Sequence, residues 1–244
     1  MKMAIGVMSY RRQSVIADFL KSLYKTKDVR DMKVIVADDS GDDDDCREFL
    51  CSVRREYDFD LFMNNPRKGI SANSNLILHQ LKDFDIIFLA NDDLVFLDTG
   101  WNEFYANEMM DSRVHHCMYG QHMLWGFRRD HAVRSTHNGR PILQMEKPMG
   151  QFLVLTKEAI KQIGYFDEQF GMYGQEHVDW SYRAVKAGLC PCFLDYPGSD
   201  SYIECKKVGS AVSRVERRKG IKENKKMFEQ FLKDKSRLYL PYRG

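Results

Sequence analysis

Short hydrophobic runs alternate with amphipathic segments through the first 98 residues, and this alternation is the strongest constraint on the fold. Four of the runs have the length of buried strands: residues 3–8, 33–37, 60–63 and 85–90. Between the first two runs, apolar side chains recur at helical spacing at Val15, Phe19, Leu20 and Leu23. Strands that alternate with helices in this way build a parallel sheet covered by helices, so the sequence predicts an α/β fold.

The length and composition exclude several classes of protein. A chain of 244 residues with 43% hydrophobic and 30% charged residues has the composition of one globular domain. Its longest apolar runs, 86–90 and 152–155, are far shorter than the roughly 20 residues that cross a bilayer. The apolar run at 3–8 is too short for a signal peptide, and no two cysteines form a Cys-x-x-Cys pair. We therefore predict a cytoplasmic protein with free thiols.

Positive charge is concentrated in the C-terminal segment 206–244. This segment has 13 Lys and Arg against 4 Asp and Glu, a balance of +9, while the remaining 24 basic and 31 acidic residues give −7. A helix is predicted over 222–235, with four apolar residues on one side: Met227, Phe228, Phe231 and Leu232. The charge predicts a tail that contacts a polyanion, an anionic membrane surface or the acidic body of its own protein. A solvated surface helix is the alternative.

Polar residues follow three of the predicted strands at their carboxyl ends: Ser9 and Tyr10, Asp38 and Asp39, and Asn91 to Asp93. In open α/β sheets, ligands bind beyond these ends. The adjacent carboxylates of Asp92 and Asp93 repel each other and have no partner within their own motif. A divalent Mg²⁺ or Mn²⁺ ion that carries a diphosphate would neutralise them, because such ions prefer oxygen ligands. A turn or helix cap is the simpler alternative.

The second part of the chain has a less regular pattern. Helices are predicted over 101–110, 157–163 and 174–187, and strands over 151–155 and 190–194. Residues 112–147 are rich in His, Arg and aromatic side chains and show no clear period.

Seven segments together resemble the family 2 glycosyltransferases of the GT-A fold: residues 5–12, 34–40, 69–75, 88–93, 150–155, 163–170 and 173–183. They occur in that family's order and span about residues 3–200. The resemblance implies a Rossmann-like nucleotide-binding sheet flanked by helices, with a smaller acceptor-side region. It implies one GT-A domain over 1–205, with a nucleotide-sugar half at 1–98 and an acceptor half at 99–205. Residues 206–244 would then form a basic helical tail.

The resemblance also implies roles in binding a nucleotide-sugar donor. Tyr10 would pack near the base. Asp39 would accept hydrogen bonds from the base or ribose, with Asp38 beside it. Lys68, in the loop before the predicted helix at 70–81, would meet the phosphates.

Two further residues receive roles from the same resemblance. Asp92 would contact the ribose or the sugar, and Asp93 would hold the divalent metal, Mn²⁺ or Mg²⁺. Relatives often supply a late histidine as a metal ligand, but no histidine follows His177 in this chain. Asp195, Asp200 or the phosphates alone are the alternatives.

The residues Glu176, His177 and Asp179 would activate the acceptor. Glycosyl transfer needs a base to remove the proton of the acceptor hydroxyl. Glu176 and Asp179 share a helix face, where Arg183 could instead neutralise them in a salt bridge. The family usually has Glu-Asp where this chain has Glu176-His177, with the Asp as base. The sequence therefore leaves the base open among the three residues.

The predicted function is metal-dependent transfer of a sugar from a nucleotide-sugar to a hydroxyl of a glycan or lipid-linked saccharide. The reaction is expected to invert the configuration of the anomeric carbon. One alternative is an enzyme that adds a sugar to a hydroxylated DNA base. The basic tail favours it, as do basic and aromatic residues of the irregular segment: Trp125, Phe127, Arg128, Arg129, His131, Arg134, Arg140 and Lys147. A second alternative is a non-catalytic nucleotide-sugar-binding module. Nucleotidyl transfer is disfavoured because residues 9–12 have no glycine.

Overall fold

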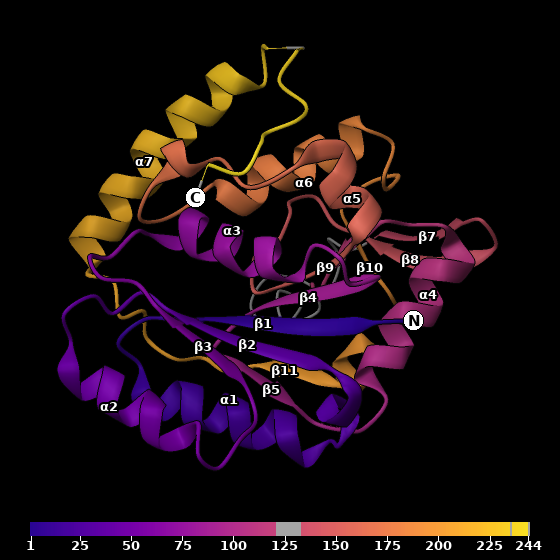
Figure 1. Ribbon diagram of the computed structural model, residues 1–244. Helices are drawn as coiled ribbons and strands as arrows, with labels where there is room; N and C mark the ends of the chain where they lie inside the picture. The colour runs from indigo at the N-terminus through magenta and orange to yellow at the C-terminus, as the bar shows by residue number, and fades with distance from the viewer. Residues whose placement is uncertain (121–132, 235, 244) are drawn as a thin grey trace.

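A six-stranded sheet with the order β3-β2-β1-β4-β9-β6 forms the centre of the fold (Figure 1). The computed structural model describes residues 1–120, 133–234 and 236–243. The strands of this sheet are β1 (Met3–Ser9), β2 (Lys33–Asp38), β3 (Asp60–Met63), β4 (Ile86–Asn91), β6 (His116–Met118) and β9 (Phe152–Thr156). The first four are parallel, which confirms the α/β prediction, whereas β9 runs antiparallel to β4 and β6 antiparallel to β9. The sheet is therefore mixed rather than wholly parallel.

Helices cover both faces of the sheet (Figure 1). The helices α1 (Gln13–Lys25) and α2 (Asp44–Val53) lie on one face. The other face carries α3 (Ile70–Leu81), α5 (Lys157–Ile163) and α6 (Glu176–Lys186), while α4 (Trp101–Ser112) lies near the N-terminal end of β1. Each of these helices was predicted from the sequence, within a few residues of its bounds.

Short elements complete the fold. The strand β5 (Leu94–Phe96) pairs with β11 (Ile203–Cys205), and β8 (Arg140–Gln144) pairs with β7 (Val133–His137) and β10 (Leu194–Asp195). The 3-10 turns are η1 (Asp28–Asp31), η4 (Glu168–Phe170) and η5 (Ser199–Ser201). The sequence did not predict β6, β7 and β8, because these strands have three to five residues and β7 is mostly exposed, which leaves no readable alternation. The strand expected over 190–194 is reduced to Leu194–Asp195.

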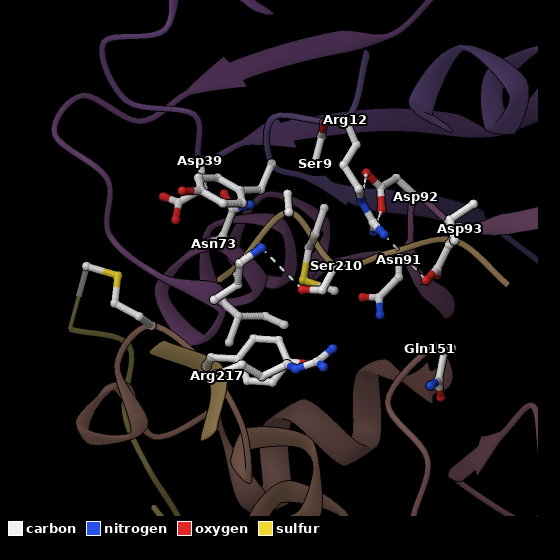
Figure 2. A pocket seen from close by; sticks show the side chains of 18 of the residues that line it. Ser9, Arg12, Asp39, Asn73, Asn91, Asp92, Asp93, Gln151, Ser210 and Arg217 are labelled. Carbon is white, nitrogen blue, oxygen red and sulfur yellow. Dashed lines mark hydrogen bonds and ion pairs between the residues drawn. The ribbon is translucent and has the colours of Figure 1, made fainter. Parts of the chain in front are cut away.

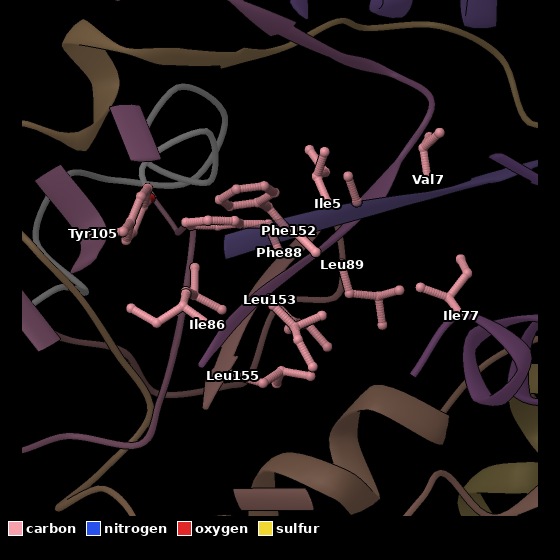
Figure 3. Packing of buried hydrophobic residues seen from close by; sticks show 14 of the residues in the cluster. Ile5, Val7, Ile77, Ile86, Phe88, Leu89, Tyr105, Phe152, Leu153 and Leu155 are labelled. Atoms are coloured by element: carbon pink, nitrogen blue, oxygen red, sulfur yellow. The ribbon is translucent and has the colours of Figure 1, made fainter. Parts of the chain in front are cut away.

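The core lies on both faces of β1, β4 and β9 (Figure 3). On one face the ring of Phe88 stacks on Phe152 at 5.8 Å and meets the ring of Trp101 edge-on at 4.8 Å. The other face buries leucines of β4 and β9 next to Ile77 of α3. A Cβ at Gly6 would lie 2.1 Å from Cγ2 of Ile77, so a residue without a side chain is needed where α3 packs on β1. This packing holds the carboxyl ends of the strands in fixed relative positions.

The C-terminal segment packs on the body of the protein. Its helix α7 (Arg214–Phe231) begins eight residues before the predicted start at 222. The buried amide of Asn224 donates hydrogen bonds to the carbonyls of Phe170, Tyr173 and Gly174 at 2.6–2.9 Å. The ring of Phe228 packs against the ring of Tyr182. The apolar side of the tail therefore faces the protein, and α7 is more than a solvated helix.

The sequence predicted no membrane-spanning segment and free cysteine thiols. Within the described ranges, no helix is long and apolar enough to cross a membrane. The six cysteines are free thiols within the described structure. Of the aromatic and basic residues that favoured a nucleic-acid acceptor, Trp125, Phe127, Arg128, Arg129 and His131 lie outside the described residues.

Candidate active site

A pocket of about 230 Å³ lies beyond the carboxyl ends of β1, β2 and β4 (Figure 2). Its walls come from these strand ends, from residues 172–173, and from residues 208–217 of the C-terminal segment. Polar residues among those that line it are Tyr10, Asp39, Asn91, Asp92, Asp93 and Gln151. The backbone N–H of Asn91 donates to the carbonyl of Gln151 at 2.9 Å, which ties the end of β4 to the segment before β9. The fold thus places four of the predicted site residues around one cavity.

Asp39 organises the loop that borders the pocket. Its Oδ1 accepts hydrogen bonds from the backbone N–H of Lys68 at 2.8 Å and from the amide of Asn64 at 3.1 Å. Its Oδ2 accepts from the backbone N–H of Gly69 at 2.9 Å and from Nε of Arg67 at 3.3 Å. A carboxylate has about four acceptor positions, and the protein fills all of them. Asp39 therefore fixes the loop 64–69 against β2.

Arg67, rather than Lys68, is the basic side chain of this loop at the pocket. Among the described residues that line the cavity, Arg67 is present and Lys68 is not. The guanidinium of Arg67 lies over the ring of Tyr10 at 4.0 Å and pairs with Glu216 at 3.0 Å. The backbone N–H groups of residues 68 and 69 bond to Asp39, and the phosphate contact expected of the Lys68 side chain stays a prediction.

Asp38 has a local role in the turn after β2. Its two oxygens accept hydrogen bonds from the backbone N–H and the hydroxyl of Ser40 at 3.0 and 2.9 Å. Burial raises the pKa of Asp38, and these hydrogen bonds oppose that shift. In the described structure Asp38 does not line the pocket, and its carboxylate orders the turn through Ser40.

The Asp92 and Asp93 carboxylates lie in the buried turn between β4 and β5, and Arg12 contacts both. Nε of Arg12 lies 3.2 Å from Oδ2 of Asp92, and Nη2 pairs with Oδ1. Nη1 lies 3.8 Å from Oδ2 of Asp93. Burial raises the pKa of Asp92 to about 7 although Arg12 acts to lower it, and burial also raises the pKa of Asp93. Arg12 was not predicted as a site residue.

Two buried oxygens at the pocket fit a hard cation. Oδ1 of Asp93 and Oε1 of Gln151 have no hydrogen-bond partner among the described residues, and both residues line the cavity. Oxygen donors of these kinds suit Mg²⁺ or Mn²⁺. The described residues contain no group of three His, Cys, Asp or Glu side chains that could hold an ion. The chain alone therefore offers part of a coordination shell, and a diphosphate would have to supply the rest.

Asp195 is not available as a further ligand. It is fully buried, and its oxygens accept hydrogen bonds from the backbone N–H groups of Gly120 and Tyr196 and from the hydroxyl of Ser199 at 2.7–2.9 Å. Asp200, the other alternative, is exposed and does not line the pocket in the described structure.

Glu176 and His177 form a pair at the start of α6. Oε1 of Glu176 lies 2.9 Å from Nδ1 of His177, and Oε2 is buried without a partner among the described residues. Burial raises the pKa of Glu176, but His177 and the first backbone N–H groups of α6 outweigh it, so the pKa lies below its ordinary value. The imidazole lies against Gly150, next to Gln151 of the pocket wall. Glu176 is therefore a buried, ionised partner that holds the imidazole.

The close contact at Gly150 gives a testable prediction. A Cβ at this position would lie 2.6 Å from Cγ of His177, so Gly150→Ala must displace the imidazole. If His177 activates the acceptor, as the family resemblance implies, we expect kcat for sugar transfer to fall by about 10²-fold with donor affinity unchanged, because a shift of about 1 Å in a catalytic group has an effect of this size. Steady-state kinetics measures it. If the loss acts through His177, the double variant Gly150→Ala/His177→Ala is no slower than His177→Ala alone.

Asp179 belongs to a different cluster from Glu176 and His177. Its Oδ2 pairs with Nε of Arg183 at 2.9 Å, and its Oδ1 pairs with Arg237. Arg237 also binds Asp167 at 2.5 Å. Asp179 is 2% exposed, with both oxygens occupied, so it is not free to take a proton from an acceptor. The sequence allowed for the pairing with Arg183 but not for Arg237, which lies 58 residues further along the chain.

The C-terminal segment contributes residues that the sequence did not predict for this site. The backbone N–H of Lys206 donates to the carbonyl of Asp93 at 2.7 Å, and Nη1 of Arg12 donates to the carbonyl of Gly209 at 3.3 Å. The side chain of Arg217 lies on the opposite wall of the pocket from Arg12 and Asp92 (Figure 2). The only sequence signal was the positive charge of residues 206–244, which predicted contact with a polyanion, an anionic membrane surface or the acidic body of the protein itself.

Two curated relatives match the chain, although no family model does. An uncharacterised glycosyltransferase of Acanthamoeba polyphaga mimivirus is 28% identical over 215 residues, which cover 84% of this chain and 81% of that protein. A GalNAc(5)-diNAcBac-PP-undecaprenol β-1,3-glucosyltransferase of Campylobacter jejuni is 25% identical over 186 residues, which cover 73% of this chain and 58% of that protein.

Solved structures of glycosyltransferases share the fold. TarS of S. aureus in complex with UDP-GlcNAc has a TM-score of 0.60 at 14% identity, over 86% of this chain and 60% of TarS. The mannosyltransferase of Pyrobaculum calidifontis in complex with GDP-Man and Mn²⁺ has a TM-score of 0.54 at 15% identity, over 77% of this chain and 52% of the mannosyltransferase.

These likenesses define the architecture as the GT-A fold, as the sequence resemblance implied. Both curated relatives are named as sugar transferases. The chain is a glycosyltransferase of the GT-A fold.

Proposed function

We propose that this protein transfers a sugar from a nucleoside-diphosphate-sugar, bound in the pocket of Figure 2, to the hydroxyl of a glycan or lipid-linked saccharide. The observation that carries the proposal is the charge arrangement in one cavity. Oxygens of Asp93 and Gln151 that have no hydrogen-bond partner among the described residues lie there together with the guanidinium groups of Arg12, Arg67 and Arg217. A diphosphate with an accompanying cation has the charges that this arrangement complements.

The donor would lie across the carboxyl ends of the strands. Tyr10 offers a ring for the base, beside the loop that Asp39 orders. The guanidinium of Arg217 has no partner in the described structure, which leaves its five N–H donors for phosphate oxygens. Asp92 would face the ribose or the sugar, as the resemblance implied. TarS and the mannosyltransferase, solved with UDP-GlcNAc and GDP-Man, support a nucleotide-sugar as donor.

We propose that Asp93 holds a divalent cation, Mn²⁺ or Mg²⁺, together with the donor phosphates. Such an ion neutralises the charge that develops on the departing nucleoside diphosphate. Asp93→Asn removes the charge but keeps the shape of the side chain. We expect it to lower kcat/KM by about 10²-fold or more, with the thermal unfolding midpoint nearly unchanged.

The measurement for this variant is nucleoside diphosphate release in a Mn²⁺ series. Asp42→Asn, which changes an exposed carboxylate that pairs with Arg11 at 3.6 Å, is the control. Wild-type turnover in Asp93→Asn, or in the wild type after treatment with a chelator, would remove the cation from the proposal.

His177 is the proposed base. When Nδ1–H donates to Oε1 of Glu176, the lone pair of Nε2 is available to accept a proton. The acceptor oxygen gives its proton to Nε2 and forms a bond to the anomeric carbon. The bond from that carbon to the phosphate oxygen breaks, and the electron pair leaves with the nucleoside diphosphate. This single displacement inverts the anomeric configuration. Glu176 stabilises the imidazolium that forms.

The proposal for the acceptor is based on a relative's name and on the charge of the C-terminal helix. The Campylobacter relative is named as acting on an undecaprenol-linked saccharide, which favours a glycan or lipid-linked acceptor. The second candidate is a hydroxylated DNA base. It rests on the basic groove along α7 that is lined by Arg218, Lys219, Lys222, Glu223 and Lys226. This groove is also the place for contact with an anionic membrane surface. We place the enzyme in the cytoplasm, where free thiols persist.

A donor and acceptor screen tests the proposed function. Purified protein is supplied with UDP-, GDP-, CDP- and dTDP-sugars, and release of the nucleoside diphosphate is measured with three acceptor sets. These are soluble oligosaccharides, polyprenyl-diphosphate saccharides in detergent, and duplex DNA with hydroxymethylated bases. The proposal expects release from one donor, stimulated by a saccharide acceptor and lost in His177→Ala. Stimulation by DNA alone would favour the second candidate, and no release or binding of any donor would favour a non-enzymatic role.

A further inference from the structure

Arg12 holds the position of a counter-ion to the two carboxylates of the site. It lies just before α1, and its side chain, 19% exposed, reaches Asp92 through two nitrogens and Asp93 through the third. Figure 2 shows its guanidinium between these two residues. The turn between β4 and β5 is buried, so an unneutralised pair of carboxylates there would be unfavourable. The guanidinium supplies the compensating charge within the protein itself.

A divalent cation and Arg12 cannot both neutralise this pair at full strength. A cation on Oδ1 of Asp93 would lie on the same carboxylate whose Oδ2 is 3.8 Å from Nη1 of Arg12. Positive charges at such separations repel each other, and the repulsion is larger in a partly buried site than in water. The protein without donor therefore has a low affinity for the cation.

Arg12 has few other contacts that would prevent it from moving. Beyond the two carboxylates, its contact among the described residues is the carbonyl of Gly209 at 3.3 Å. Gly209 is exposed, and no atom lies within 4 Å of the position where its Cβ would be. A diphosphate in the pocket offers several anionic oxygens in the geometry that a guanidinium prefers. The donor can therefore draw Arg12 away from Asp92 and Asp93.

We infer that Arg12 exchanges between the Asp92–Asp93 pair and the donor diphosphate, so that the divalent cation and the nucleotide bind cooperatively. This inference rests on the proposed donor and cation sites. In the protein without donor, Arg12 excludes the cation. When the diphosphate takes up Arg12, the carboxylate of Asp93 is released for the cation. Arg12 is thus a positioning residue that couples the two binding events.

The coupling is measured as Mn²⁺ affinity of the full chain, by electron paramagnetic resonance of free Mn²⁺, with no nucleotide and with saturating UDP or GDP. For Arg12→Gln we expect Mn²⁺ to bind about tenfold more tightly without nucleotide, a typical size for coupling between sites. The ratio of the Mn²⁺ dissociation constants without and with nucleotide should fall about tenfold relative to the wild type. Arg12→Lys keeps the charge and should stay closer to the wild type.

Arg11→Gln is the matched control, because Arg11 is adjacent but pairs with Asp42 and Asp43 at 3.6 and 3.3 Å. It should leave both dissociation constants unchanged. Equal or weaker Mn²⁺ binding by Arg12→Gln without nucleotide would overturn the inference, as would the absence of Mn²⁺ binding in wild type and variant alike. If neither UDP nor GDP binds the wild type, then the donor proposal is in question, while the comparison without nucleotide still tests Arg12.

Discussion

His177→Ala is expected to lower kcat for sugar transfer by about 10² to 10⁴-fold, the usual contribution of a general base, with donor affinity little changed. The imidazole is held by Glu176 at 2.9 Å and by the close surface at Gly150, so its orientation is set before the acceptor arrives. Single-turnover kinetics with bound donor isolates the transfer step.

Two companion variants separate catalysis from packing. His177→Asp restores the residue type that the family resemblance implies at this position, and we expect it to retain more activity than His177→Ala. Glu176→Gln keeps the shape but removes the charge that stabilises the imidazolium, so it should lower kcat without changing donor affinity. Wild-type kinetics in both His177→Ala and Glu176→Gln would place the base elsewhere.

The second large effect is expected on stability, at the buried ion cluster of Asp179. Asp179→Asn removes one charge from a network in which Arg183 and Arg237 share its two oxygens. Arg183 is 3% exposed and would be left without its anionic partner. Breaking a buried pair in this way costs about 3–5 kcal/mol of unfolding free energy. Urea denaturation measures the loss, with Lys33→Met as the control, because Lys33 and Asp60 form an exposed pair worth less than about 1 kcal/mol.

This prediction also separates two roles for Asp179. If the residue only holds the C-terminal segment on α6, then folded Asp179→Asn at low temperature transfers sugar at close to the wild-type rate. Arg237→Met should cost a similar amount of stability, and the double variant should cost less than the sum because the two residues share one network. A variant with normal stability and no transfer would return Asp179 to the catalytic site.

The first half of the fold could be predicted because its signals are local. The runs that became β1, β2 and β4 are buried along their length, and α1 has its apolar residues at helical spacing. The antiparallel strands β6 and β9 pair across a long connection, so the mixed sheet depends on contacts that no local pattern encodes.

In the candidate site, too, the residues with local signals were predicted and those that depend on distant contacts were not. Tyr10, Asp39, Asp92 and Asp93 follow strands directly, so the sequence placed them at one edge of the sheet, and the structure brings them together around the pocket. Arg217 reaches the same cavity only because the C-terminal segment folds back, which the charge count could not reveal.

For Glu176 and Asp179, the spacing predicted a shared helix face but not the partner that each carboxylate takes. Glu176 and Asp179 both start α6, yet one binds His177 and the other binds arginines. That choice depends on Arg237, whose position follows from tertiary packing.

The most direct test of the account is a crystal structure of the protein with Mn²⁺ and the nucleoside diphosphate of the donor that the screen identifies. The account predicts the base beside Tyr10, the diphosphate between Asp93 and Arg217, and the guanidinium of Arg12 turned from Asp92 toward a phosphate. A nucleotide bound outside this pocket, or one bound in it with no phosphate contact to Arg217 or to a cation on Asp93, would contradict the account.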